Sequence, residues 1–295
     1  MAGVYKSKTA AQQVHDQYRR YLDRWPVPSE QRLVPTREGE TFVIASGPRH
    51  APPVLLLHGT MATAAMWMRE IVTWAEHFRV HALDIIGDAG LSAPSRPSLA
   101  NAAHALWLED VLAELEIQKT CVVGQSLGGW LALDFAMRRP DRVAGLVLMT
   151  PGGIADRNIL VWALPLLLLG PWGVRKVRER IVGRFPAAVS EEAREFLRFT
   201  DAIYKGMRPR TERPPTATDA QLAALTMPVL TLLGEFDVTM DSHRIKDRVE
   251  NNVPAAEVRI IPGARHYLGD QVGTILDFLL RVNGESYTAP AEGEA

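Results

Sequence analysis

Ser126 is the residue of this 295-residue chain whose surroundings point most directly to chemistry. It lies at the centre of a Gly-x-Ser-x-Gly-Gly string, 124–129, which follows a short apolar run and opens a helix-compatible stretch. A strand, a tight turn and a helix in that order lift a serine hydroxyl out of the core on a strained backbone. The start of the helix also offers unpaired N–H groups that favour negative charge. We therefore expect Ser126 to be a nucleophile; the alternative is a serine N-cap in a glycine-rich loop.

A serine hydroxyl is a weak nucleophile until a base removes its proton, and a histidine base needs a carboxylate to orient it. Two later apolar runs end in loops that carry Asp237 and His266. Strand ends of a parallel sheet meet at one edge, so the chain order Ser126, Asp237, His266 predicts a catalytic triad. Glu235 is the alternative acid, and a cap on the last helix is the alternative role for His266.

Acyl chemistry also needs two N–H donors for the oxyanion. The N–H of Leu127, directly after the nucleophile, is one candidate. The His-Gly loop after an earlier apolar run offers the second, the N–H of Thr60 or, as the weaker alternative, of Met61. We expect His58, which opens that loop, to hold it by hydrogen bonding rather than to act as a base.

Apolar runs alternate with helical segments along most of the chain, which predicts an α/β fold: a mostly parallel sheet with helices on both faces. A Glu-Gly-Glu turn near the start predicts an antiparallel hairpin at the sheet edge. Strands are expected at 31–35, 41–45, 54–57, 78–86, 121–123, 143–149, 229–233 and 257–261, and helices at 10–25, 64–75, 99–116, 127–138, 242–250 and 270–282.

The alternation pauses in a stretch of helix-like sequence interrupted by proline and glycine. We expect this stretch to form a helical cap over the C-terminal edge of the sheet, where α/β folds bind ligands. The predicted organisation is an N-terminal helix packing on the core (1–30), an α/β core in two pieces (31–152 and 221–283), the cap (153–220) and a flexible tail (284–295).

The cap holds more large apolar side chains than a solvated pair of helices needs. Some must pack the cap onto the core, and the remainder predicts an apolar substrate pocket. The candidate substrate-binding residues are Met61, Trp67, Trp162, Leu166 and Tyr267. Core packing is an equal alternative for Trp67.

Composition sets the class of partner. With 33 Lys+Arg against 34 Asp+Glu, the net charge of −1 provides no field that would attract nucleic acid or an anionic membrane. A small-molecule partner is therefore expected, for a monomer or homodimer. No motif calls for a metal or an organic cofactor.

The single cysteine, Cys121, falls in a predicted buried strand and fits a core residue in a reducing compartment. The first ten residues lack the apolar region of a secretory signal. The most apolar stretch, 159–169, is about half the length of a membrane span. We therefore expect a cytoplasmic protein without a membrane span.

Together these features resemble the α/β-hydrolase-fold serine hydrolases over roughly 31–282. More narrowly, Asp-Ile-Ile-Gly-Asp at 84–88 and Ile-Ala-Ser-Gly-Pro at 44–48 resemble the bacterial carboxylesterase branch typified by naproxen-type carboxylesterases. The resemblance implies hydrolysis of a carboxylic ester with an apolar part, through an acyl-enzyme and without a cofactor. Many relatives carry Arg-Gly-His-Gly where this chain has Ile-Gly-Asp-Ala-Gly. This difference leaves the substrate preference open, but it does not affect the prediction of the triad.

The same triad serves lactonases, thioesterases, carbon–carbon bond hydrolases and biosynthetic cyclases or acyl-transfer enzymes, and these alternatives stay open. Haloalkane dehalogenases and epoxide hydrolases are disfavoured because they need a carboxylate where Ser126 stands. A non-catalytic ligand-binding protein on the same fold is disfavoured because a binder need not keep all three groups.

Overall fold

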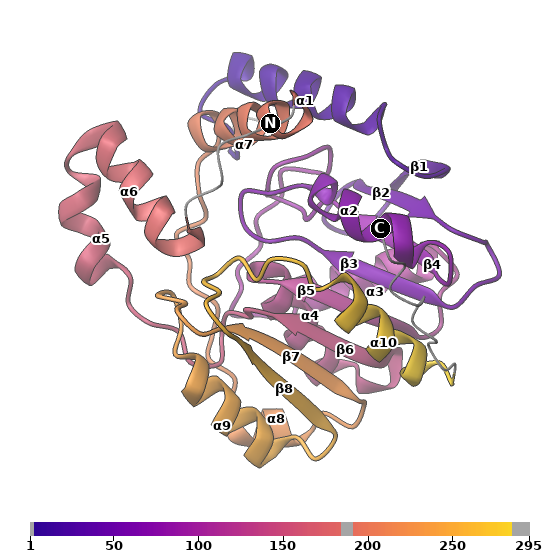
Figure 1. The fold of residues 1–295 in the computed structure, drawn as a ribbon. Coiled ribbons are helices and arrows are strands. Elements are labelled where there is room, and N and C mark those ends of the chain that lie inside the picture. Colours follow the sequence, from indigo (N-terminus) through magenta and orange to yellow (C-terminus); the bar gives the residue numbers. More distant parts are fainter. Residues whose placement is uncertain (1–2, 184–190, 285–295) are drawn as a thin grey trace, which may run out of the picture.

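The computed structural model describes residues 3–183 and 191–284, and in these residues it forms an eight-stranded sheet flanked by helices (Figure 1). The strand order is β1-β2-β4-β3-β5-β6-β7-β8. The first two pairings in that order are antiparallel and the remaining five are parallel. The strands are β1 (Ser29–Val34), β2 (Thr41–Ser46), β3 (Pro53–Leu57), β4 (Arg79–Leu83), β5 (Thr120–Gln125), β6 (Val143–Met149), β7 (Val229–Gly234) and β8 (Ala256–Ile261).

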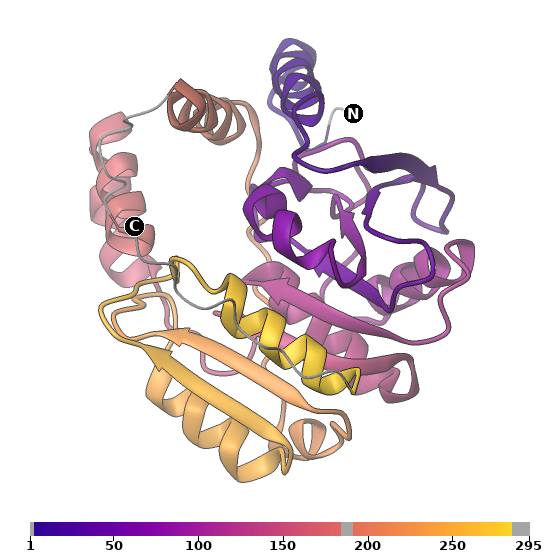
Figure 2. The ribbon, with the colours of Figure 1, turned by 45° about the vertical axis from the view of Figure 1, so that its right-hand side comes forward.

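Helices lie on both faces of this sheet (Figures 1 and 2). They are α1 (Lys8–Leu22), α2 (Met68–Trp74), α3 (Ala103–Glu114), α4 (Leu127–Arg138), α5 (Leu160–Leu167), α6 (Gly170–Val182), α7 (Glu191–Gly206), α8 (Asp219–Ala223), α9 (Ser242–Asn252) and α10 (Val272–Val282), with short 3-10 helices η1 (Ala64–Trp67) and η2 (Pro140–Arg142). The predicted architecture, a mostly parallel sheet between helices with a helical insertion, is confirmed.

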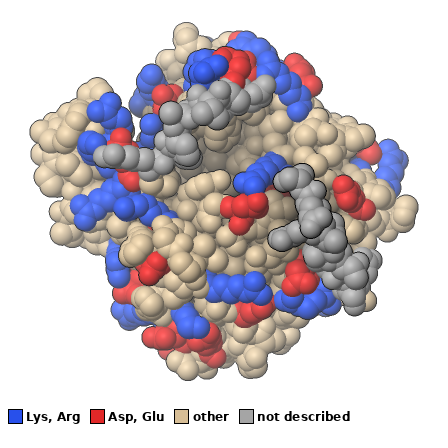
Figure 3. Space-filling view, in the orientation of Figure 1, with Lys and Arg blue, Asp and Glu red and all other residues tan. Residues whose placement is uncertain are grey.

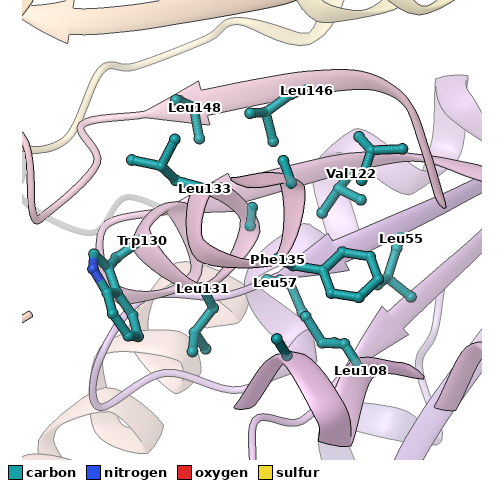
Figure 4. Packing of buried hydrophobic residues seen from close by; sticks show 14 of the residues in the cluster. Leu55, Leu57, Leu108, Val122, Trp130, Leu131, Leu133, Phe135, Leu146 and Leu148 are labelled. Carbon is teal, nitrogen blue, oxygen red and sulfur yellow. The ribbon is translucent and has the colours of Figure 1, made fainter. Parts of the chain in front are cut away.

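Alternation along the central strands divides the core into two layers. In β3, Leu55 and Leu57 belong to the cluster under α3, α4, α8 and α9, whereas Val54 and Leu56 belong to the cluster under α2 and α10. Successive side chains of a strand point to opposite faces, so a strand that is apolar throughout must be covered twice. Figure 4 shows the first layer, with Phe135 of α4 close to the leucines of β3.

Several predicted boundaries differ from the structure by a few residues, and two of them show why. The strand expected at 78–86 ends at Leu83, because the chain then folds around Asp84, whose carboxylate accepts hydrogen bonds from the N–H groups of Ala64 and Leu91. The helix expected at 99–116 begins only at Ala103, after a turn. Most of the tail predicted at 284–295 lies outside the described residues.

The cap helices α5 and α6 pack on each other, and α7 packs beside α1 (Figure 2). An ion pair of 2.7 Å between Arg178 and Asp201 joins α6 to α7. All three cap helices lie toward the C-terminal ends of the parallel strands (Figure 1). None of the helices in the described ranges is long and apolar enough to cross a bilayer.

Helix α1 connects the cap to the core. Its buried residues Ala11, Val14, Tyr18 and Leu22 recur at helical spacing and form one face. The Tyr18 hydroxyl donates a 2.9 Å hydrogen bond to the buried Asp84 carboxylate, and its ring stacks on Phe199 of α7 at 5.7 Å. The predicted N-terminal helix thus packs on the core and on a cap helix at once.

Replacing Tyr18 with Phe tests this connection. Removing the hydroxyl leaves the buried Asp84 carboxylate one donor short, so we expect the free energy of unfolding to fall by about 1–3 kcal/mol. Chemical denaturation at neutral pH measures the change. Tyr5→Phe is the control, because the Tyr5 hydroxyl only accepts a longer 3.3 Å contact from the Gly90 N–H and its loss should cost less. Equal effects of the two substitutions would contradict the interpretation.

Candidate active site

Ser126 lies at the turn between β5 and α4, with φ 54° and ψ −111°. A positive φ is uncommon for a residue with a side chain and stores backbone strain. The turn is also tight: a Cβ on Gly124 would lie 2.3 Å from the Gly128 carbonyl oxygen, and a Cβ on Gly128 would lie 2.2 Å from that of Leu57. Only glycine fits both positions, because α4 packs closely on β3 and β5. This close packing explains the two glycines of the motif, Gly124 and Gly128.

Loops from three strands meet at Ser126. His266, after β8, has its Nε2 2.9 Å from the Ser126 Oγ. Its Nδ1 lies 2.7 Å from the Oδ2 of Asp237, which follows β7. Since a carboxylate only accepts, Nδ1 carries the proton and Nε2 is free to accept the serine hydroxyl proton. The three groups form one hydrogen-bonded chain.

The environment of Asp237 keeps its carboxylate ionised. Burial raises the pKa of this group, but hydrogen bonds from His266 and from the hydroxyl and backbone N–H of Thr239 outweigh burial and hold the pKa below its usual range. Both Thr239 bonds are 2.7 Å long and end on Oδ1, which leaves Oδ2 to the imidazole. Thr239 is a site residue that the sequence did not single out.

The alternative acid, Glu235, is directed elsewhere. Its carboxylate accepts a 2.7 Å hydrogen bond from the N–H of Gly263. Asp156, also near the site, accepts both its hydrogen bonds from the N–H of Gly153, and burial raises its pKa. Within the described residues, Asp237 is therefore the carboxylate hydrogen-bonded to His266.

Two residues beside Ser126 have backbone N–H groups without an acceptor among the described residues. The cavity that contains Ser126 is also lined by Thr60 and Leu127, and among the described residues neither backbone N–H has a hydrogen-bond partner. The N–H of Met61, the alternative donor, already donates a 2.8 Å bond to the buried Asp88 carboxylate. Met61 has φ 58°, and this bond helps to hold the strained backbone that presents Thr60.

His58 fixes the other end of the same loop. Its Nδ1–H donates to the Gly59 carbonyl at 2.8 Å, and its Nε2 accepts the Ile85 N–H at 2.9 Å. The two contacts set one neutral tautomer, and burial lowers the pKa of His58 to about 4. The ring holds the loop, as expected from the sequence.

Two cavities share part of their walls near the candidate nucleophile. The open cavity, of about 530 Å³, is lined by Ser126 and His266. The inner cavity, of about 270 Å³, is lined mostly by apolar side chains of the core and of α7, with Arg69 and Glu70 also on its wall. Both are lined by Thr60, Met61, Ala62, Met66, Gln125 and Tyr204. On the face shown in Figure 3 the surface is hollowed beneath α1 and α7, and charges of both signs are interspersed around it.

The predicted substrate-binding residues separate into two groups. Met61 lines both cavities, and Trp67 and Tyr267 line the inner one. Trp162 and Leu166 of α5 line neither cavity in the described part of the chain, and the Arg180 guanidinium lies 4.7 Å from the centre of the Trp162 ring.

Sequence reasoning missed part of the cavity wall on α7. Ile203 and Tyr204 line the inner cavity together with Phe196, Phe199 and Thr200. The signal was present, because these positions recur at three- and four-residue spacing along one helix face. The spacing does not show which element of the fold this helix face packs against.

Comparisons with known proteins agree with the geometry. The family described as alpha/beta hydrolase fold matches residues 52–178. The carboxylesterase nap of Bacillus subtilis strain 168, itself uncharacterised, is 32% identical over 88% of this chain and 88% of its own length. Carboxylesterase YbfK of the same strain is 32% identical over 85% of this chain and 86% of its own. The crystal structure of naproxen esterase (carboxylesterase NP) from Bacillus subtilis superposes with a TM-score of 0.80 at 31% identity, covering 93% of this chain and 98% of that one.

Among the described residues, no group of three or more His, Cys, Asp or Glu side chains is arranged to hold a metal ion.

Replacing His58 with Leu tests its role as a neutral brace. The substitution leaves the Gly59 carbonyl and the Ile85 N–H buried without partners, so at pH 7 we expect a loss of about 2–3 kcal/mol in the free energy of unfolding. His58 has a folded-state pKa of about 4, below the unfolded value of 6.5, so the unfolded chain binds the extra proton between these values.

The stability that the neutral ring contributes is therefore complete above pH 6.5 and decreases as the pH falls toward 4. The destabilisation by His58→Leu should shrink by about 1.4 kcal/mol per pH unit below pH 6.5, so that it vanishes at about pH 5. Denaturation curves at several pH values measure it, with the exposed His50→Leu as control. A cost independent of pH would show that His58 is not buried in its neutral form.

Proposed function

Because this chain belongs to the α/β-hydrolase fold family and is related over most of its length to bacterial carboxylesterases, we propose that it cleaves carboxylic esters with an apolar part. The observation that carries the proposal is the Ser126–His266–Asp237 hydrogen-bonded chain, which lies at a cavity that Thr60 and Leu127, with N–H groups unpartnered among the described residues, also line. A base-activated hydroxyl and an oxyanion site are the two requirements of acyl transfer through serine.

In the proposed reaction, His266 Nε2 removes the Ser126 proton as Oγ attacks the ester carbonyl carbon. The N–H groups of Thr60 and Leu127 stabilise the oxyanion of the tetrahedral intermediate, and Asp237 stabilises the imidazolium. His266 then gives the proton to the departing alcohol oxygen as its bond to the carbonyl carbon breaks. Water, deprotonated by His266, then attacks the carbonyl carbon of the acyl-enzyme. The bond between this carbon and the Ser126 Oγ breaks, the acid leaves, and His266 returns the proton to the Ser126 hydroxyl.

Hydrolysis is favoured over cyclisation or acyl transfer by the access to the site. The cavity of about 530 Å³ that contains Ser126 and His266 is open to solvent and partly polar, with Asp156, Arg157 and Arg213 on its wall. Water therefore reaches the position from which it would attack an acyl-enzyme. An enzyme that transfers the acyl group to another acceptor gains from excluding water.

Replacing Ser126 with Ala tests the nucleophile. We expect kcat for an activated ester to fall by about 10⁴- to 10⁶-fold, with the free energy of unfolding changed by less than about 1 kcal/mol. A fluorophosphonate probe should label the unmodified protein and Ser29→Ala, a matched change on the edge strand, but not Ser126→Ala. Turnover or labelling retained without the hydroxyl would refute the assignment.

A pair of substitutions separates the two candidate acids. Asp237→Asn should lower kcat by about 10⁴-fold, because the amide no longer holds the imidazole in the required tautomer. Glu235→Gln should stay within about threefold, because the Glu235 carboxylate accepts its hydrogen bond from the Gly263 N–H and not from His266 in the described part of the chain. Steady-state kinetics at the pH optimum compares them. A larger effect at Glu235 would overturn the choice of acid.

A further inference from the structure

Phe199 of α7 lines two cavities at once. One is the inner cavity of about 270 Å³ beside the candidate nucleophile. The other, which we call the outer cavity, has about 280 Å³ and lies between α1 and α7. Among the described residues, Phe199 is the one lining residue that the two share; the outer cavity is lined by Gln17, Arg20, Tyr21, Arg24, Glu195, Arg198 and Phe199. Phe199 therefore lies between a mostly apolar cavity and one lined mainly by charged and polar side chains.

Two tyrosines of α1 pack against the Phe199 ring. It stacks on Tyr18 at 5.7 Å with an interplanar angle of 15°, and on Tyr21 at 5.5 Å and 20°. Its side chain is 3% exposed. Tyr18 is itself anchored by its hydrogen bond to Asp84 in the core. The position of this ring is thus set by the N-terminal helix and not by the cap alone.

The position of His266 decides which part of an ester enters the inner cavity. The leaving alcohol must lie within hydrogen-bond reach of His266 Nε2 to receive its proton. His266 lines the open cavity and not the inner one. The alcohol therefore leaves through the open cavity, and the acyl group extends past Thr60 and Gln125, which line both cavities, into the inner cavity, whose wall includes Phe199.

We propose that Phe199 sets the maximum length of the acyl group, so that the preferred substrates are esters of apolar acids short enough to end at its ring. The inference deepens the proposed esterase function and rests on it. Each methylene buried in the inner cavity raises kcat/KM by about fourfold, until the chain reaches the ring. A longer acyl chain has to displace the Phe199 ring, which is stacked on two tyrosines, and kcat/KM therefore decreases.

The test measures kcat/KM for p-nitrophenyl esters of straight-chain acids from acetate to dodecanoate. The unmodified protein should show a maximum within the series. Phe199→Ala should open the inner cavity to the outer one and move this maximum to longer chains. The ratio of kcat/KM for the longest ester to kcat/KM for the wild-type optimum should rise by about sixteenfold, equivalent to two further buried methylenes at about fourfold each. An unchanged maximum in folded Phe199→Ala overturns the proposal.

Leu197→Ala is the matched control. Leu197 lies two residues earlier on α7 and, in the described part of the chain, is not among the residues that line the inner or the outer cavity. Its removal should leave the maximum at the same chain length. If both substitutions move the maximum equally, the effect comes from loosening α7 and the proposal fails.

Phe199→Leu provides a second test in case the alanine variant does not fold. Leucine keeps apolar contact between α7 and α1 while shortening the wall, so the maximum should move in the same direction by a smaller step. Thermal unfolding identifies which variants are folded. A folded leucine variant with the wild-type maximum overturns the proposal even if the alanine variant cannot be made.

A binding series separates this inference from the proposed function. If no ester of the series is hydrolysed, the esterase function fails. Calorimetric titration of the unmodified protein and Phe199→Ala with alkanoate anions of increasing length then tests the wall alone. Kd should improve with length up to a break, and the break should move to longer chains in the variant. A common break, or no binding of any alkanoate, contradicts the role of Phe199.

Discussion

The contact between the start of α4 and the end of β3 is the constraint on which the rest of the site depends. The Gly128 N–H donates to the His58 carbonyl at 3.1 Å, and any side chain at Gly128 would collide with the backbone of β3. This approach brings the Leu127 N–H, the Thr60 N–H and the Ser126 hydroxyl to the same cavity. Without it, the loops after β3 and β5 would present the same groups at separate places.

The second organising feature is the path from the core to the cap through α1. A single side chain, Tyr18, hydrogen-bonds to Asp84, the residue that follows β4 in the chain, and stacks on Phe199 of α7. Arg24 near the end of α1 pairs with Glu195, also on α7. The wall of the inner cavity is therefore braced by a helix that is the most distant in sequence from the cap, and the shape of the cavity depends on both.

Buried ionisable groups make the stability of the core depend on pH in two opposing ways. Burial lowers the pKa of His58, His81 and His104 to about 4, so their neutral forms contribute stability that decreases as the pH falls below 6.5. Burial raises the pKa of Asp84 to about 6 and of Asp88 to about 7, so their ionisation in the fold becomes costly as the pH rises through those values. Both carboxylates accept backbone N–H groups of the loops around the site, which offset part of that cost.

Much of the fold was predictable because it is encoded in local patterns. The apolar runs, the glycines around Ser126 and the loops at the strand ends each reflect constraints that act within a few residues, and parallel strand ends necessarily share an edge. The resemblance to bacterial carboxylesterases is confirmed by relatives that cover most of the chain. The same reasoning singled out Ser126, Asp237 and His266, which lie in hydrogen-bond contact.

Tertiary structure alone decided which helices form the wall of the inner cavity. Helical periodicity shows that α5 and α7 each have apolar positions, but not which face docks on what, because docking depends on contacts between segments far apart in the chain. Trp162 and Leu166 of α5 consequently lie outside both cavities, while Ile203 and Tyr204 of α7 line the inner one. The sequence by itself determined the chemical groups and the edge of the sheet where they meet; the packing of α1 against α7 determined the shape of the space beside them.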